Sequence, residues 1–414
     1  MREGQLEIMA PAGNFECLQA AIQGGADSVY FGIGRLNMRS HSANNFAAED
    51  LAEVCRICRE RGVRSYLTLN ITLYNEDLED MRRTLQLARE AGISAVIASD
   101  MAAISYARSL GLEVHISTQL SISNSESLRF YAQFADVVVL ARELTLVQVK
   151  EISRIIDEEH ICGPGGKPLR IELFCHGALC MAVSGKCYLS LHEYNASANR
   201  GSCYQLCRRG YEVTDLETGM KLEIDNKYIM SPRDLCTIEF MDRIIDAGVT
   251  VFKIEGRARS SEYVKTVTQA YRQAADAVED GSYTPQLAAS LKARLETVFN
   301  RGFWDGYYLG AKMGQWSEVY GNRATRVKRY VGKITNYFEK IGVAEILMET
   351  GSLSVGDTIV ISGPTTGVYE AEVPEIRVDL KPVATAVKGE LCSIPVSVKL
   401  RRSDKVFLFE TVRS

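Results

Sequence analysis

The sequence predicts an α/β protein with three parts: a β/α barrel, a cysteine-rich insertion and a small all-β barrel. Three observations lead to this fold class. Short apolar runs alternate with amphipathic helical stretches from residue 6 to about residue 280. From His176 to about Asn226 the helical period fails, and Cys, Gly, Ser, Asn and Arg accumulate. Beyond residue 320, strand-like runs separated by glycines take over, a pattern typical of a separate β domain.

Eight apolar runs have the length and composition of buried parallel strands. Several follow a glycine placed where a helix would end, as in Ala91-Gly92-Ile93. Eight such strands favour a closed TIM-like β/α barrel. An open doubly wound sheet is the alternative, because periodicity counts strands without showing closure. The predicted strands are Leu6–Met9, Ser28–Phe31, Ser65–Leu69, Ala95–Ala98, Glu113–Ile116, Asp136–Leu140, Arg170–Phe174 and Val249–Ile254, and the helices between them include residues 14–23, 48–61, 77–91 and 145–156.

The insertion follows the seventh predicted strand, at the end of the strands where barrel enzymes carry their chemistry. We therefore expect a barrel domain over residues 1–320, with the insertion at about 176–226, and a second domain over residues 325–414. Strand-like runs at residues 331–335, 343–348, 357–361 and 392–400 predict that the second domain is a small β-barrel.

Overall charge excludes one class of function. The 414 residues include 48 Lys and Arg against 52 Asp and Glu, a net charge of −4, which rules out a protein that coats nucleic acid through general positive charge. The polar start and the lack of any run near the roughly 18 apolar residues of a membrane span predict no targeting segment and no membrane contact. We expect a cytoplasmic protein, whose thiols stay reduced.

Cysteines are concentrated in one region, with seven of the eleven between Cys162 and Cys236. Four gathered thiolates could hold either zinc or an iron–sulfur cluster. Six residues separate the first pair in the insertion and three the second, which fits the short zinc knuckle poorly and favours the larger cluster. We expect the cysteines outside the region to be ordinary buried side chains. The four candidate ligands are Cys180, Cys187, Cys203 and Cys207, with Cys236 further along.

One long motif identifies a family. The segment Glu172-x-Phe174-x-x-Gly177-Ala178-Leu179-Cys180-x4-Gly185-x-Cys187-x-Leu189-Ser190 matches, without a departure, the signature of the collagenase-like peptidase family. The resemblance extends over nearly the whole chain, through Met9-Ala10-Pro11-Ala12-Gly13, Ala141-Arg142-Glu143-Leu144 and Lys253-Ile254-Glu255-Gly256-Arg257.

The resemblance implies more than peptidase activity. The family includes tRNA hydroxylation proteins that make 5-hydroxyuridine at the wobble position, and this chain looks most like that branch. By position it implies a 4Fe–4S cluster on Cys180, Cys187, Cys203 and Cys207, with Cys236 as a reserve fourth ligand. Spacing alone does not choose between Cys207 and Cys236. The resemblance also implies tRNA as the partner and prephenate as the co-substrate.

A small carboxylate co-substrate would need arginine forks. Arg39, Arg142 and Arg257 each lie just after a predicted strand, and so at the expected catalytic rim. Asn70 and Gln119 occupy comparable positions and complete the expected substrate-binding set. His115, His176 and Glu255 are the candidate catalytic residues. The alternative is that these charged groups form rim salt bridges that hold the barrel shut.

Two other functions compete with RNA hydroxylation. Peptide hydrolysis has no motif here, since neither His-Glu-x-x-His nor Gly-x-Ser-x-Gly occurs, and a cysteine protease would have to pair a thiol with His115 or His176. The other alternative is a non-catalytic iron–sulfur scaffold.

RNA binding needs local positive charge and exposed aromatic rings. The second domain is expected either to bind RNA or to join copies of the chain into a homo-oligomer. The candidate RNA contacts are Arg200, Arg208 and Arg209 beside the cysteines, Arg323, Arg326, Lys328 and Arg329 leading into the second domain, and Tyr204, Tyr211 and Tyr330.

Overall fold

The computed structural model describes residues 6–41, 45–212, 214–220, 230–310, 315–317 and 321–412. The predicted end of the insertion near residue 226 and the predicted domain end at residue 320 lie outside these ranges. No helix in the described ranges is both long and apolar enough to cross a membrane.

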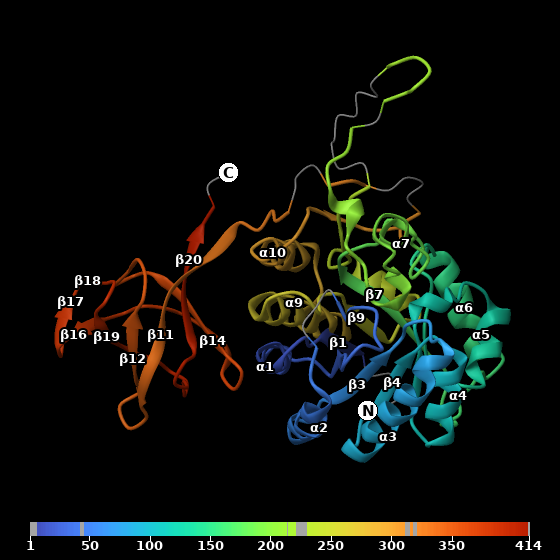
Figure 1. Cartoon of the computed structure of the whole chain (residues 1–414), viewed down its shortest axis with the longest axis horizontal. Coiled ribbons are helices and arrows are strands. Elements are labelled where there is room, and N and C mark those ends of the chain that lie inside the picture. The colour runs from blue at the N-terminus through green and yellow to red at the C-terminus, as the bar shows by residue number, and fades with distance from the viewer. Residues whose placement is uncertain are drawn as a thin grey trace.

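A closed parallel barrel forms the larger part of the molecule (Figure 1). Each strand pairs in parallel with the next, and the last pairs with the first through Glu7 opposite Val251. This closure confirms the TIM-like barrel and excludes the open sheet. The barrel strands are β1 (Glu7–Pro11), β2 (Ser28–Phe31), β3 (Arg64–Leu69), β4 (Ala95–Ala98), β5 (Val114–Ile116), β6 (Val137–Val139), β7 (Arg170–Gly177) and β9 (Val251–Ile254).

Helices surround the barrel and cover its apolar outer face (Figure 1). Local signals set their ends: the Asn14 side chain accepts a hydrogen bond from the Cys17 N–H at the start of α1, and Gly92 ends α3 in the left-handed conformation (φ 77°). The helices are α1 (Phe15–Gln23), α2 (Leu51–Glu60), α3 (Leu78–Ala91), α4 (Met101–Ser109), α5 (Ser125–Ala132), α6 (Leu146–Glu158), α8 (Met241–Asp246), α9 (Ser261–Glu279) and α10 (Pro285–Leu295).

The region after the seventh barrel strand differs from the prediction in detail. β7 runs to Gly177, three residues beyond its predicted end, so His176 belongs to the strand and not to the insertion. Two short strands that the sequence did not reveal, β8 (Asp234–Cys236) and β10 (Phe303–Trp304), extend the sheet from the end of β7. The insertion itself contains a short helix, α7 (Leu189–Tyr194).

The C-terminal part is all β, as predicted. It has a core of its own, in which Val331, Ile346 and Ile361 are completely buried, and its main sheet runs in the order β15-β14-β20-β11-β12-β19-β16-β17. β19 stops at Pro395, short of the predicted residue 400. The strands are β11 (Arg326–Phe338), β12 (Val343–Met348), β13 (Ser352–Ser354), β14 (Thr358–Gly363), β15 (Gly367–Glu372), β16 (Ile376–Val378), β17 (Lys381–Val383), β18 (Thr385–Val387), β19 (Leu391–Pro395) and β20 (Lys405–Thr411).

The predicted basic run at the start of β11 is largely used in ion pairs. Arg326 pairs with Glu370 and Arg329 with Glu410, both at 2.7 Å, within the C-terminal part. Lys328 reaches Glu262 of α9 at 2.8 Å and so joins the two parts of the molecule. These three cations have protein partners, which weakens their case as an RNA footprint.

The barrel core predicts a clear contrast between two leucines. Leu67 on β3 is completely buried, whereas Leu87 on α3 is 38% exposed. Leu67→Ala should lower the free energy of unfolding by about 2–5 kcal/mol, because it removes buried methyl groups and leaves a cavity. Leu87→Ala should change it by less than about 0.5 kcal/mol. Urea unfolding of both variants measures the difference, and equal losses would contradict the described core.

Candidate active site

A polar cavity opens at the carboxyl ends of the barrel strands, where the insertion meets the loops that follow β2, β3, β5, β6 and β9. Parallel strands bring residues that are far apart in sequence to this one rim. Ten of the candidate ligand, catalytic and substrate-binding residues line the cavity: Arg39, Asn70, Gln119, Arg142, Cys180, Cys187, Cys203, Cys207, Glu255 and Arg257.

The insertion is fastened to the barrel by specific contacts. The Arg200 guanidinium donates to the Asp77 carboxylate at 2.7 Å and to the Thr72 carbonyl at 2.9 Å. The next residue, Gly201, has a φ of 87° and lies so close to Ser40 that a Cβ would overlap its Oγ. Only glycine fits this approach without strain. These contacts hold the loop that carries Cys203 against the barrel.

Arg208 joins two of the cysteine loops. Its guanidinium donates to the Leu179 carbonyl at 2.7 Å, next to Cys180, and to the Pro232 carbonyl at 2.5 Å. Arg200 and Arg208, which were candidate RNA contacts, therefore have structural partners within the protein.

The four cysteine side chains in the cavity could offer a metal only sulfur ligands. Cys180 is exposed, and Cys187, Cys203 and Cys207 are half-buried. Burial raises the pKa of Cys207 to about 11, which Arg208 opposes and the neighbouring thiols reinforce. No histidine is found among the described residues that line the cavity. Within the described ranges, no three His, Cys, Asp or Glu side chains are already gathered as metal ligands.

Next to the thiols, the cavity carries an excess of positive charge. Six arginines and Lys253 line it, against a single carboxylate, Glu255, among the described residues. Arg39 pairs with Glu255 at 2.8 Å. Burial by itself would raise the pKa of Glu255, but the charges of Arg39 and the neighbouring arginines outweigh it and hold the pKa at about 2. Glu255 is thus a fixed anion, and most of the arginine charge stays uncompensated.

Arg257 and Arg142 are two of the cavity arginines to which the described residues supply no carboxylate hydrogen bond. Arg257 is 5% exposed and donates to Asn37 Oδ1 and Thr68 Oγ1, both at 3.0 Å. Arg142 stacks on the ring of Phe174, 3.8 Å from its centroid, and its buried Nε has no hydrogen-bond partner. Buried guanidinium groups held by neutral partners are suited to binding an anion.

Sequence reasoning missed part of this cavity. Lys253 lines it from within β9, where its Nζ donates to Glu172 at 2.7 Å and lies 4.7 Å from the centroid of the Tyr30 ring. Arg259 and Arg301 also line it. The sequence could have indicated Lys253 through its position in the segment that includes Glu255 and Arg257. A lysine inside a buried strand can be interpreted, however, only once its carboxylate partner is known.

The two histidines do not line the cavity. His115 is completely buried inside the barrel, with Nε2 3.0 Å from Glu113 Oε1 and Nδ1 3.8 Å from Glu172 Oε2. The register of β7 against β9 shifts between Phe174 and His176. This irregularity leaves His176 against Tyr271 of α9 (Nδ1 to Oη 3.4 Å) and Phe303, away from the thiols.

Cys236 also lies apart from the four thiols. It is buried on β8, directly opposite His176, and the Tyr271 hydroxyl lies 3.9 Å from its Sγ. It does not line the cavity that the other four share. The structure thus places Cys180, Cys187, Cys203 and Cys207 around one cavity. Cys236, the reserve ligand, lies outside it.

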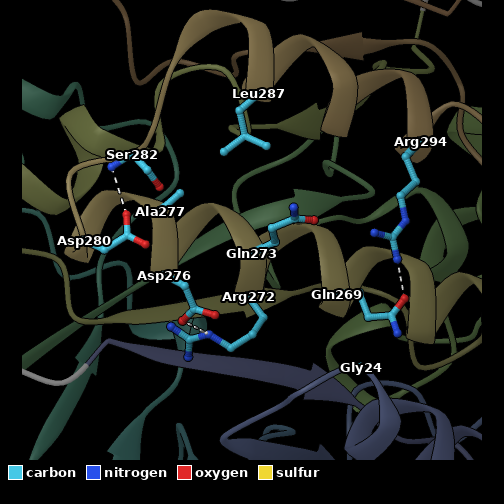
Figure 2. Close-up of a pocket in the computed structure, with 10 residues that line it drawn as sticks. All are labelled: Gly24, Gln269, Arg272, Gln273, Asp276, Ala277, Asp280, Ser282, Leu287 and Arg294. Carbon is cyan, nitrogen blue, oxygen red and sulfur yellow. Dashed lines mark hydrogen bonds and ion pairs between the residues drawn. The ribbon is translucent and has the colours of Figure 1, made fainter.

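A second hollow lies on the outside of the barrel against α9 and α10 (Figure 2). Its polar groups mostly satisfy one another: Arg272 pairs with Asp276 at 2.7 Å, Asp280 accepts from the Ser282 N–H, and Arg294 donates to Gln269. No thiol or histidine is among its described lining residues. Four thiols do line the cavity at the carboxyl ends of the strands, which we call the rim cavity.

A closed parallel barrel with its polar cavity at the carboxyl ends of the strands has the architecture of the barrel enzymes. The model of Peptidase family U32 matches residues 13–318. The chain belongs to this family, which confirms the resemblance found in the sequence.

Similar proteins carry two kinds of name. A "Collagenase" of Porphyromonas gingivalis is 58% identical over 99% of both chains. "tRNA hydroxylation protein P1" of Bacillus subtilis is 33% identical, over 86% of this chain and 83% of its own. Among solved structures, the U32 peptidase Mk0906 aligns with 61% of this chain and 93% of its own, at 12% identity and a TM-score of 0.39.

The buried His176 predicts a pH dependence of stability. Burial lowers its pKa from the ordinary 6.5 to about 3. Between pH 6.5 and pH 3, His176 is protonated in the unfolded chain but neutral in the folded chain. The free energy of unfolding therefore decreases as the pH falls through this range, by up to about 1.4 kcal/mol per pH unit. His176→Leu should make the fall of unfolding free energy with pH shallower, as measured by urea unfolding across this range. The exposed His192→Leu serves as the control, and an unchanged slope for His176→Leu would contradict the described environment.

Proposed function

We propose that this protein is an iron–sulfur-dependent RNA hydroxylation enzyme that converts wobble uridine in tRNA to 5-hydroxyuridine, with prephenate as co-substrate. The observation that carries the proposal is the rim cavity, in which four thiols and an unbalanced set of arginines face the same space. We expect the reaction to take place in the cytoplasm, where the thiols stay reduced.

The four thiols are the proposed ligands of a 4Fe–4S cluster. Thiolate donors suit iron–sulfur clusters, and neither carboxylate nor imidazole competes in this group. Binding would draw the loops of Cys180, Cys187, Cys203 and Cys207 closer together, and the positive iron would offset the mutual repulsion of their thiolates. A cluster held by all four thiolates would supply electron transfer, whereas one with an iron left without a protein ligand would also supply a position for a substrate oxygen.

The arginines are the proposed site for the carboxylates of the co-substrate. The guanidinium groups of Arg257 and Arg142 donate hydrogen bonds to neutral acceptors. An incoming carboxylate can therefore form bidentate hydrogen bonds with them without displacing an acidic side chain. Arg39 is held by Glu255 at the same rim. Prephenate carries two carboxylates, which matches a site with more than one available arginine.

The tRNA partner is supported by relatives that share most of this chain. The Bacillus subtilis relative named for tRNA hydroxylation matches 86% of it, including the segment from the barrel to the cysteine insertion. We extend that activity to this protein because the rim cavity contains both the thiols and the anion site.

Peptide hydrolysis is the second candidate, because the relative at 58% identity is named "Collagenase". A cysteine protease needs a thiol activated by a nearby base. Among the described residues, no cavity thiol is hydrogen-bonded to a histidine, since His115 and His176 face other partners. A non-catalytic iron–sulfur scaffold would use the thiols but would not need the arginines.

Iron content tests the cluster assignment. Protein purified without oxygen should be coloured and contain iron and sulfide, and Ser replacement of Cys180, Cys187, Cys203 or Cys207 should lower the iron per chain at least severalfold, because each removes a thiolate ligand. Cys236→Ser and the remote, buried Cys392→Ser are the controls and should keep it. Loss of iron in Cys236→Ser but not in Cys207→Ser would make Cys236 the fourth ligand. A colourless, iron-free wild type that cleaves gelatin would favour the peptidase.

Nucleoside analysis tests the reaction. tRNA from a strain lacking this protein should lack wobble 5-hydroxyuridine, and wild-type protein should restore it. Arg257→Met should keep its iron and restore at least tenfold less modification, since a charge-assisted bidentate contact is lost. The exposed Arg402→Met is the matched control and should restore it fully. Unchanged 5-hydroxyuridine in the deletion strain would count against this function.

A further inference from the structure

Three exposed tyrosines lie in the cysteine insertion, and two of them are in contact. Tyr188 is 73% exposed, Tyr204 54% and Tyr194 48%. Single exposed aromatic residues are ordinary, but a group of them marks a surface that binds something. We call this group, together with Arg209, the tyrosine platform.

Local contacts hold the platform in shape. The rings of Tyr194 and Tyr204 meet edge to face, with centroids 5.3 Å apart. Arg209 donates to the Tyr194 hydroxyl at 3.1 Å and lies 5.8 Å from the centroid of that ring. The Tyr204 N–H donates to Ser190 Oγ at 3.0 Å, which anchors the Tyr204 loop to α7. The rings of Tyr194 and Tyr204 are therefore both exposed and held in place.

The platform belongs to the same loops as the thiols. Tyr188 directly follows Cys187, and Tyr204 directly follows Cys203. In both places the cysteine lines the rim cavity while the next residue is exposed. Ser190, which holds Tyr204, lines the cavity as well. A polymer lying on the platform would thus be positioned to extend a residue into the cavity.

We propose that the tyrosine platform binds unpaired nucleotides of an RNA substrate by stacking their bases on Tyr188, Tyr194 and Tyr204. This rests on the proposed function and adds the surface that holds the RNA. Three features favour unpaired RNA over a protein partner: flat rings that match bases of any sequence, an exposed guanidinium that can pair with phosphate, and a cavity with an excess of arginines beside it, which attracts a polyanion.

The test is direct binding. The probes are a fluorescein-labelled RNA hairpin with a uridine-containing loop and the same stem without a loop, measured by fluorescence anisotropy with the anaerobically purified full chain. Tyr194→Ala and Tyr204→Ala should each weaken binding of the loop hairpin about tenfold, because a stacking surface is removed. Tyr204→Trp should preserve binding. The exposed Phe130→Ala, at a 51% exposed position on α5, is the control and should change nothing.

The outcomes separate this proposal from the proposed function. Iron content and tRNA modification are measured on every variant, so a lost cluster is not mistaken for lost stacking. Two results would overturn the proposal that the platform binds RNA, even if the wild type still makes 5-hydroxyuridine. One is equal affinity of the Tyr→Ala variants and the wild type for the loop hairpin, and the other is equal affinity of the wild type for the looped and loopless RNA. Binding of gelatin that the same substitutions abolish would also overturn it, in favour of a protein partner.

Discussion

A buried ion pair between Glu172 of β7 and Lys253 of β9 spans the seam between the seventh and eighth strands of the barrel. Both side chains are buried, and an unpaired charge in either place would be strongly destabilising. The insertion leaves the barrel from the end of β7, and Glu255 and Arg257 follow β9. Thiols and arginines therefore face one cavity because this seam is closed.

Charge distribution matters more here than net charge. The chain as a whole is mildly acidic, at −4, yet the rim cavity concentrates arginines with few acidic neighbours. Elsewhere arginines such as Arg56 and Arg154 pair along their own helices. A focused positive cavity in an acidic protein favours selective capture of small anions and local phosphate contacts over general adhesion to nucleic acid.

The two kinds of name carried by relatives imply different chemistry, and both would have to use side chains at the rim. The barrel is shared by many kinds of enzyme, and function resides in the side chains placed at its rim. At this rim the thiols are grouped with arginines and are separated from the buried histidines His115 and His176. Such a grouping fits a cofactor and an anion, whereas a thiol protease needs imidazole and sulfur in contact.

The sequence by itself determined the eight barrel strands, the all-β C-terminal part and most of the residues at the rim. These follow from local patterns, since a polar residue just after a buried parallel strand lies at the same rim in any closed barrel. Tertiary structure alone decided the closure, the irregularity in β7 that leaves His176 against α9, the position of Cys236 behind the barrel wall and the pairing of Lys328 with Glu262. Each depends on contacts between residues far apart in the chain, which periodicity and spacing do not encode.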